Sequence, residues 1–465
     1  MASRQHAPPG GLAPPGPLLR VGLAALLTLL ATAALPRPTD AGDAKPVLFS
    51  SSVILFNVKD MSYIWRQDAR VSSWCAQIGN NAHKQGSDQI SVVLTQNWMP
   101  VISTYECPKP NDCRPKYDHY TIKHYCYRDV TGSECKPFTW DVAADFQQKL
   151  TSCLGTLVEQ GFKQIMITPH LDNAIDNNQW RNWLRMNPTE KIDGFSFWDI
   201  QLSPIANAVN ANLQRGVTFL VNLQGEMGTS MFGWPQEYSR LKGMVKKAAI
   251  EGKQDLHARV KIGFKINFEK VAGYADQVNG GINGDEVRKL FKMAEYIALS
   301  AYAPVDASGF GPNDLQRSAQ IADEELRQWG VESLKKRKLY YGEFGVGGGT
   351  SPYCDKLAKS SHEAAATPQY GTCWQYQPKM DPWSNSNAVR DFMRRYYDAA
   401  LDWLAKGTGP TYYISGVFAW NLVSWDVQGI HPLSYDGNGE SFKDQVVAAD
   451  IIDHNKKVAG KRRRA

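Results

Sequence analysis

Two glutamates stand directly behind apolar runs that are typical of buried strands. Glu226 follows Phe219-Leu-Val-Asn-Leu-Gln-Gly, and Glu343 follows Leu339-Tyr-Tyr-Gly. Two carboxyl groups held about 5 to 5.5 Å apart can cleave a glycosidic bond with retention of configuration, because one protonates the departing oxygen while the other attacks the anomeric carbon. The first group needs a raised pKa and the second must stay ionised through hydrogen bonds. This chemistry requires a fold that brings together two residues far apart in the chain.

The elements that must position these glutamates alternate along the chain after residue 45. Short apolar runs are separated by longer segments whose apolar residues recur at spacings of three and four, as in amphipathic helices. We predict strands at 53–57, 90–94, 164–168, 218–222, 261–266, 296–300, 339–342 and 416–420. We predict helices at 142–160, 236–250, 314–330 and 387–406. Eight strands with eight crossovers favour a closed α/β fold, the (β/α)8 TIM barrel, over an open doubly wound sheet.

In a barrel, the residues at the C-terminal ends of the strands line a single mouth, so we expect the catalytic and binding residues there. Glu226 follows the fourth predicted strand and Glu343 stands at the seventh, so the two face the cavity from opposite sides. Aromatic rings suit the C–H faces of sugars, and polar side chains suit their hydroxyls. The other candidates for substrate binding at strand ends are Trp98, His170, Asp172, Asn267, Tyr302 and Trp420. Tyr302 is placed to donate a hydrogen bond to Glu343.

Two further residues, Trp180 and Arg181, follow Asp172 closely. They either reach the cleft or belong to a salt-bridged loop, and the sequence leaves both interpretations open.

The chain resembles the clan A glycoside hydrolases over residues 50–450. The segments that carry the resemblance are Gly342-Glu343-Phe344-Gly345, Ser300-Ala-Tyr-Ala-Pro, Phe418-Ala-Trp-Asn and Thr168-Pro-His-Leu-Asp. The resemblance implies a retaining enzyme built on a barrel, with Glu226 as acid/base and Glu343 as nucleophile. It also implies that Trp420 is the platform beneath the reacting sugar.

One position departs from the pattern of the clan. Many members have an asparagine before the acid/base that holds the substrate's 2-hydroxyl, whereas Gly225 stands there in this chain. In this respect the chain is similar to divergent branches that include some mannan-degrading families. Asn222, Asn267 and His170 are the candidates for the missing contact.

The composition fits a large folded protein. The chain has 465 residues, of which 43% are hydrophobic and 21% charged, and its 14 tryptophans supply much flat aromatic surface. Part of the net charge of +6 lies in the basic C-terminal segment 456–465, so the remainder is nearly neutral. This balance argues against nucleic acid as a partner. The basic segment is predicted to be a solvated tail, and the alternative is attraction to an anionic wall polymer.

The first 44 residues have the features of a secretory signal peptide. A basic, Pro-rich lead ends at Arg20, and the apolar run 21–35 is shorter than the roughly 20 residues that span a bilayer. We therefore predict a secreted protein without stable membrane insertion, and an uncleaved membrane anchor is the alternative. The catalytic barrel is predicted to cover residues 45–455.

The eight cysteines are best explained as disulfides of an exported protein. Six of the eight lie in two long insertions, 104–137 and 349–386, which fall on the mouth face of the barrel. Disulfides there would stiffen the walls of the cleft without entering the reacting centre.

Several other kinds of site are disfavoured. No Cys-x-x-Cys pair is present and His170 with Asp172 lacks an obvious third ligand, so no metal is expected. The glycine run 347–349 lacks the lysine of a phosphate loop, and no Gly-x-Ser-x-Gly elbow occurs. No cofactor is expected. Two functions remain: a monomeric secreted glycosidase acting on a polysaccharide or oligosaccharide, or a catalytically silent barrel that binds wall or matrix glycan.

Overall fold

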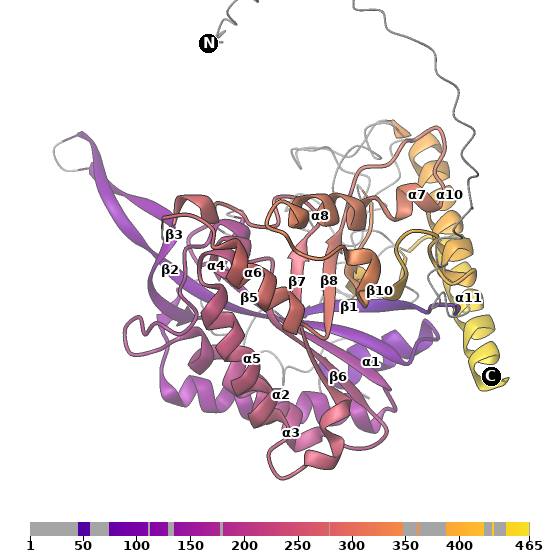
Figure 1. Ribbon diagram of the computed structural model, residues 1–465, viewed down its shortest axis with the longest axis horizontal. Helices are drawn as coiled ribbons and strands as arrows, with labels where there is room; N and C mark the ends of the chain where they lie inside the picture. The colour runs from indigo at the N-terminus through magenta and orange to yellow at the C-terminus, as the bar shows by residue number, and fades with distance from the viewer. Residues whose placement is uncertain are drawn as a thin grey trace, which may run out of the picture. The chain divides into compact units, whose positions relative to one another are not determined.

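Eight parallel strands form a closed ring in the computed structural model (Figure 1). In ring order they are β1 (Phe49–Leu55), β2 (Gln89–Lys109), β5 (Gln164–Asn173), β6 (Thr218–Gly225), β7 (Val260–Asn267), β8 (Tyr296–Ala301), β9 (Leu339–Phe344) and β10 (Ile414–Leu422). β1 pairs in parallel with both β10 and β2, which closes the barrel. All eight predicted strands and the (β/α)8 fold are confirmed.

The structure describes residues 45–55, 74–109, 112–128, 134–176, 180–278, 280–346, 360–361, 387–422, 430–431 and 443–464. They belong to one compact unit, Ala44–Ala465. The predicted signal segment 1–44 and most of the insertion 349–386, with Cys354 and Cys373, lie outside the described residues.

The strands are apolar on both faces because helices cover the outside and side chains fill the inside. One interior layer consists of six buried residues, Met166, Leu220, Tyr296, Ala298, Tyr340 and Phe418. Above this layer the side chain of Lys265 on β7 passes Gly342, whose missing Cβ would lie 3.3 Å from Lys265 Cδ and 3.4 Å from Met166 Sδ. A charged side chain therefore rises inside the barrel toward its C-terminal end.

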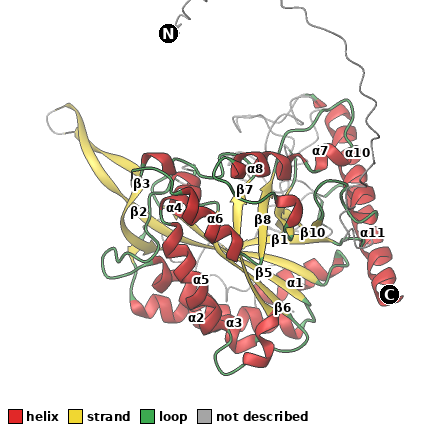
Figure 2. Ribbon diagram, viewed as in Figure 1, coloured by secondary structure: helices red, strands yellow, loops and turns green. Residues whose placement is uncertain are grey.

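The outer layer is helical (Figure 2). Its helices are α1 (Trp74–Lys84), α2 (Trp140–Glu159), α3 (Ser203–Asn212), α4 (Gly228–Gly233), α5 (Pro235–Ala249), α6 (Gly284–Met293), α7 (Pro312–Leu315), α8 (Arg317–Arg327), α10 (Asn387–Ala405) and α11 (Gln445–Arg464). The predicted helices 142–160, 236–250 and 387–406 are confirmed as α2, α5 and α10. The predicted helix 314–330 is instead two helices, α7 and α8, because Gln316 interrupts it and bonds through its side chain to the segment before β10.

The C-terminal basic segment belongs to helix α11, which continues to Arg464. Its earlier turns are buried against the start of β1. The side chain of Asn455 accepts a hydrogen bond from the Phe49 amide (2.9 Å) and donates to the carbonyls of Phe49 and Gln85 (both 2.8 Å). Helix α11 thus joins the end of the chain to the first strand.

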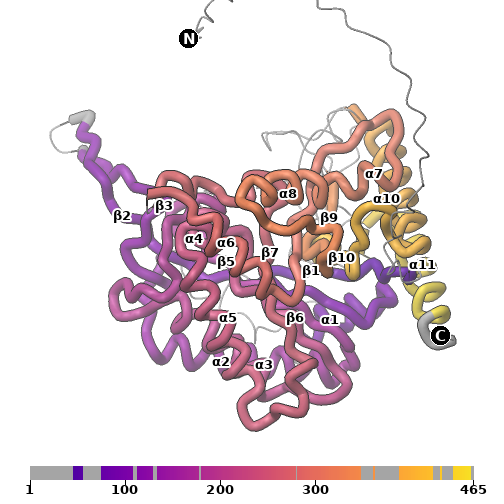
Figure 3. Tube along the Cα trace, in the orientation of Figure 1, coloured from indigo at the N-terminus to yellow at the C-terminus, as the bar shows by residue number. Residues whose placement is uncertain are grey.

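The insertion after strand β2 is a hairpin rather than an irregular loop. β2 continues beyond the barrel and pairs in antiparallel fashion with β3 (Asp112–Tyr127), as the tube in Figure 3 shows, and β3 pairs with β4 (Lys136–Pro137). Disulfides Cys107–Cys113 and Cys126–Cys135 lie within this insertion. A third disulfide, Cys75–Cys153, joins α1 to α2 in the outer layer.

Among the described residues, no helix combines the length and hydropathy needed to cross a lipid bilayer.

Candidate active site

The two glutamates occupy the ends of two strands that are separated in the ring by β7 and β8. Glu226 comes directly after β6, the fourth strand of the barrel, and Glu343 lies on β9, the seventh. Both side chains are buried, with exposures of 7% and 4%. Because a buried carboxylate is costly unless it is paired, each glutamate requires a partner.

Glu343 has two donors. Lys265 Nζ contacts Glu343 Oε1 as a buried ion pair, and Tyr302 Oη donates to Glu343 Oε2 at 2.8 Å. The predicted contact from Tyr302 is therefore confirmed. Burial raises the pKa of Glu343 above its ordinary value, with the nearby charge of Glu226 adding to the effect and Lys265 opposing it. Burial and Glu343 also raise the pKa of Tyr302, which keeps its hydroxyl protonated as a donor.

Glu226 is held by an arginine. Arg181 Nη1 donates to Glu226 Oε2 at 2.6 Å, while its Nε and Nη2 donate to Asp172 Oδ1 at 3.0 and 2.7 Å. Arg181 lies in the short 3-10 helix η2 (Arg181–Trp183). Burial alone would raise the pKa of Glu226, but the charge of Arg181, helped by Lys265 and Ser300, lowers it below its ordinary value. In this arrangement Glu226 is ionised.

The backbone at Glu226 is also constrained. Its φ is 60°, in the left-handed region that non-glycine residues seldom adopt. The Glu226 amide donates to the carbonyl of Lys265 at 3.0 Å, which fixes this turn against β7. Such backbone conformations occur preferentially at functional sites, where the surrounding structure holds them in place.

The two ion-pair networks belong to one buried charged group. The charge of Glu226 raises the pKa of Glu343, and that of Lys265 lowers the pKa of Glu226, so the groups of the two networks interact with one another. Three carboxyl groups, those of Asp172, Glu226 and Glu343, face two cations, Arg181 and Lys265. One bound proton brings the group to neutrality, which is the charge state that burial favours. The site can therefore hold one protonated and one ionised glutamate.

The position before Glu226 is occupied by Gly225, where the structure leaves no room for a side chain. A Cβ at position 225 would lie 2.4 Å from His170 Cδ2 and 2.5 Å from Thr168 Cγ2, so no larger residue fits beside this histidine. Burial, followed by the charges of Arg181 and Lys265, lowers the pKa of His170 well below its ordinary value. A neutral imidazole thus fills the space in front of Gly225.

Several polar atoms around the mouth are buried and have no hydrogen-bond partner within the described part of the chain. They belong to Thr95, His170 and Asn267, which lie on β2, β5 and β7. Buried polar groups are normally satisfied, so a cluster of unsatisfied ones indicates a place for a polar ligand. Both donors and acceptors are present, as a ligand with several hydroxyl groups requires.

Three of the predicted binding residues differ in where they are buried. Trp420 lies close to the charged group, with Lys265 Nζ 6.0 Å from its ring centroid, and packs in a small cluster with Tyr302. Asn222 is fully buried in the barrel interior, where its Nδ2 donates to Thr168 Oγ1 at 2.8 Å. Trp98 is 2% exposed and belongs to the main hydrophobic core, because the extended β2 turns this side chain into the packing beneath β3. The indole of Trp98 therefore offers no open face to a sugar.

Lys265 belongs to the candidate site but is absent from the residues predicted for it, although the sequence contains a signal. A lysine inside the predicted apolar strand 261–266 has to be buried in a barrel, and buried lysines need an acidic partner. For Arg181 the sequence allows either a residue that reaches the site or a salt-bridged loop, and the structure shows an ion-paired arginine that contacts Glu226. No group of His, Cys, Asp and Glu suited to hold a metal ion occurs among the described residues.

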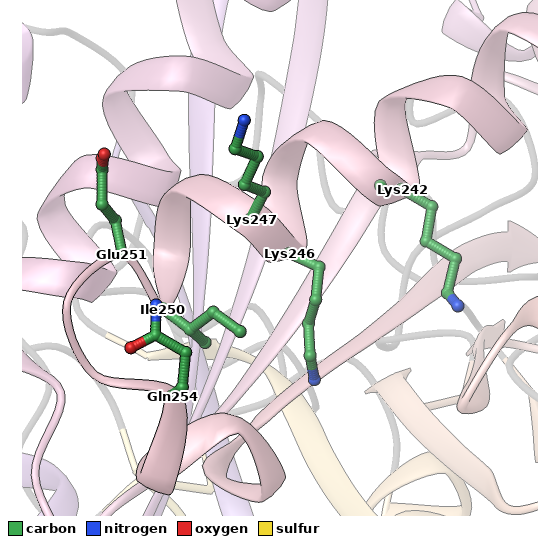
Figure 4. Close-up of a pocket in the computed structure, with 7 residues that line it drawn as sticks. Lys242, Lys246, Lys247, Ile250, Glu251 and Gln254 are labelled. Carbon is green, nitrogen blue, oxygen red and sulfur yellow. The ribbon is translucent and has the colours of Figure 1, made fainter.

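A separate cavity of about 520 Å³ lies on the outer surface of α5. Figure 4 shows its lining, which includes Lys242, Lys246 and Lys247. Lys246 is bonded to the carbonyl of His257 at 2.9 Å, and none of the predicted site residues lines this cavity. It is distinct from the candidate active site.

No protein-family model and no curated protein sequence matches the chain. Solved structures do match. A GH113 β-mannanase from Alicyclobacillus acidocaldarius has a TM-score of 0.45 at 11% identity, over 90% of this chain and 99% of that one. A GH5_18 protein from Bifidobacterium longum subsp. infantis has a TM-score of 0.42 at 10% identity, over 89% and 79%. A GH5 xyloglucan-specific endo-β-1,4-glucanase from a metagenomic library has a TM-score of 0.38 at 12% identity, over 88% and 96%.

Proposed function

We propose that this protein is a secreted retaining glycoside hydrolase that cleaves O-glycosidic bonds of a polysaccharide by double displacement. One observation carries the proposal: two buried glutamates at the ends of the fourth and seventh barrel strands share one charged group with two cations. That group is neutral when it holds one proton, and the proposed reaction needs one acid and one carboxylate.

In the first step, the Glu343 carboxylate attacks the anomeric carbon while Glu226 gives its proton to the departing oxygen. The C–O bond to the leaving sugar breaks and a glycosyl ester to Glu343 forms. Tyr302 and Lys265 orient the Glu343 carboxylate from two sides.

In the second step, Glu226 takes a proton from a water molecule, whose oxygen attacks the same carbon. The ester bond breaks, Glu343 is released as a carboxylate, and the configuration at the anomeric carbon is retained. Without substrate, burial raises the pKa of Glu343 and Arg181 lowers that of Glu226, which favours the shared proton on Glu343. For Glu226 to begin the cycle as an acid, substrate binding must move the Arg181 guanidinium away from it, because a carboxyl paired to arginine stays ionised. The proton is then held by Glu226, and Glu343 is the carboxylate.

This requirement also supports a second candidate, a catalytically silent barrel that binds glycan. If Arg181 keeps its bond to Glu226 when the glycan is bound, no acid is available. The unsatisfied polar groups at the mouth would then serve binding alone.

Activity measurements distinguish the hydrolase from the silent barrel. The substrates are soluble mannan, glucan, xylan and galactan, and NMR follows the anomers of the products. We expect products of retained configuration from at least one polymer. Glu343→Gln should lower kcat by about 10⁴-fold or more while binding of the polymer persists, because the attacking carboxylate is lost. Equal rates for both proteins would exclude the nucleophile role.

The acid/base role has its own test, which uses an aryl glycoside with a good leaving group. Glu226→Ala should still form the glycosyl ester but hydrolyse it slowly. Added azide should restore turnover and yield a glycosyl azide of retained configuration, because azide fits the space of the lost side chain and needs no general base. An azide product of inverted configuration would assign Glu226 to the nucleophile role instead.

Secretion is proposed from the signal-like segment 1–44 and is supported by the three disulfides. Expression of the full chain in a eukaryotic host should yield protein in the medium with its N-terminus close to residue 45. Retention in the membrane fraction would favour the uncleaved anchor.

A further inference from the structure

A cluster of aromatic side chains lies immediately beside Arg181. Trp183 is its centre: its ring centroid is 4.7 Å from that of Tyr274, 5.5 Å from that of Tyr120 and 5.6 Å from that of Trp180. All four side chains are partly exposed, unlike the aromatic residues of the barrel core. The hydrophobic core therefore does not account for them fully.

The cluster lies where the hairpin meets the barrel. The Arg185 amide donates to the Tyr120 carbonyl at 2.8 Å, so the segment that carries Trp180 and Trp183 runs along β3. Charged groups lie at its edge, with the Arg185 guanidinium 6.0 Å from the Tyr120 ring centroid and 3.9 Å from Asp118. Flat apolar faces edged by polar groups are what a sugar ring contacts in a binding site.

The position of the cluster relative to the glutamates is informative. Arg181, between Trp180 and Trp183 in helix η2, reaches Glu226 directly. In the ring of strands, β5 and the hairpin of β2 and β3 follow β6 on one side, whereas β7, β8 and then β9, which carries Glu343, follow it on the other. The aromatic cluster thus adjoins Glu226, with Tyr120 on the side away from Glu343 and Tyr274 in the segment that follows β7.

We propose that Tyr120, Trp180, Trp183 and Tyr274 bind the sugars of a polysaccharide on the leaving-group side of the cleaved bond. The inference rests on the proposed function, because Glu226 protonates the departing oxygen and its outer neighbours therefore contact the departing part of the polymer.

The experiment compares two kinds of substrate. One is whichever of soluble mannan, glucan, xylan or galactan the wild type cleaves, and the other is the matching oligosaccharide 4-nitrophenyl glycoside, whose leaving group is not a sugar. Trp183→Ala should lower kcat/KM on the polymer about tenfold, because one aromatic contact is worth about 1.4 kcal/mol, and should leave kcat/KM on the aryl glycoside unchanged. Tyr120→Ala, on strand β3, should act in the same direction.

The matched control is Tyr413→Ala. Tyr413 is 43% exposed and precedes β10, at the end of the barrel opposite to the mouth, so both activities should equal those of the wild type. Equal loss on polymer and aryl glycoside in Trp183→Ala would overturn the inference, because the cluster would then act only through Arg181 or through folding. No loss on the polymer would overturn it as well.

If the protein is not a hydrolase, a binding measurement still tests the aromatic cluster. If the wild type cleaves no substrate, retardation of the protein in gels that contain each polymer replaces the rate measurement. Weaker retardation of Trp183→Ala than of Tyr413→Ala would support the aromatic cluster as a glycan surface. Equal retardation of the two variants would reject it.

Discussion

Arg181 is the residue whose behaviour decides the chemistry of the site. It bonds to Asp172 and Glu226 at once, and it keeps Glu226 ionised in the absence of substrate. A substrate hydroxyl that takes over one of these bonds would release Glu226 to accept a proton. The energy of such an exchange is small, because one hydrogen bond to a charged group replaces another.

Replacement of Arg181 by methionine tests this role. The pKa of Glu226 should rise, because the positive charge that favours its ionised form is removed. An acid loses activity as the pH rises through its pKa, so the alkaline limb of the kcat/KM profile should move to higher pH. The profile is measured with an aryl glycoside.

Arg240→Met is the control, since Arg240 is an exposed arginine with a surface acidic partner. Its pH profile should match that of the wild type. Movement of the acidic limb in Arg181→Met, with the alkaline limb unchanged, would instead make Glu226 the nucleophile.

Tyr302→Phe removes one of the two donors to Glu343 without changing the size of the ring. A hydrogen bond to a charged group contributes about 1.5–3 kcal/mol, so kcat should fall about 10- to 100-fold if the bond is present in the transition state. Tyr340→Phe, a buried tyrosine of the lower barrel layer, is the comparison and should retain its kcat. A Tyr302→Phe variant with wild-type kcat would show that Lys265 alone positions the carboxylate.

The residues of the site could be predicted in part. The ends of apolar strands can be recognised in the sequence, so the positions of Glu226, Glu343 and Asp172 at strand ends were predictable. The bond from Tyr302 to Glu343 was also predictable, because the two residues lie at the ends of neighbouring strands. The burial of the Trp98 indole could not be predicted, because the sequence does not reveal that β2 continues as a hairpin that covers it. Ion pairing by Arg181 and Lys265 depends on side-chain directions that strand patterns do not specify.

At the level of elements, the disulfide between α1 and α2 stabilises the outer layer of the barrel. It joins residues that are 78 positions apart, whereas Cys107–Cys113 joins residues only 6 positions apart. A covalent link restricts the unfolded chain more when the loop it closes is longer. The two bonds should therefore differ in their effect on stability.

Loss of the longer link should lower the free energy of unfolding by about 4 kcal/mol in the double variant Cys75→Ala, Cys153→Ala, against about 2 kcal/mol for Cys107→Ala, Cys113→Ala. Urea unfolding followed by tryptophan fluorescence measures both. An equal loss in the two variants would indicate that packing around the sulfurs, rather than the restriction of the unfolded chain, determines their contribution.

The strands and helices were predictable where a single hydrophobic pattern dominated the segment. Buried parallel strands are continuously apolar, and all eight were located. The hairpin of β2 and β3 was expected as a Cys-bearing loop, because its exposed, charged and aromatic residues lack the apolar run of a core strand. Helix α11 was expected in part as a solvated tail, since its last turns are rich in lysine and arginine.

At the scale of the whole molecule, Asn455 connects the two ends of the barrel sequence. Its side chain satisfies three backbone groups, on Phe49 and Gln85, that are more than 350 positions away. Asn455→Ala should lower the free energy of unfolding by about 3 kcal/mol or more, because each buried backbone group left without a partner costs about 1–3 kcal/mol. Thermal or urea unfolding measures the loss.

The neighbouring exposed Lys456 provides the control, and Lys456→Ala should unfold as the wild type does. If Asn455→Ala were as stable as the wild type, water or a shifted helix would have to satisfy β1, and α11 would not be required to close the barrel.

The attachment of α11 to the beginning of β1 has a practical consequence for coupling the protein to a surface or to a fusion partner. The segment from residue 45 and the last turns of α11 both depart from the base of the barrel, because strand β1 starts there and helix α11 returns to it. The glutamates occupy the other end of the strands. A surface, a fusion partner or a bead coupled through either of these segments would therefore leave the mouth facing the solution, and long polymers could enter it without obstruction.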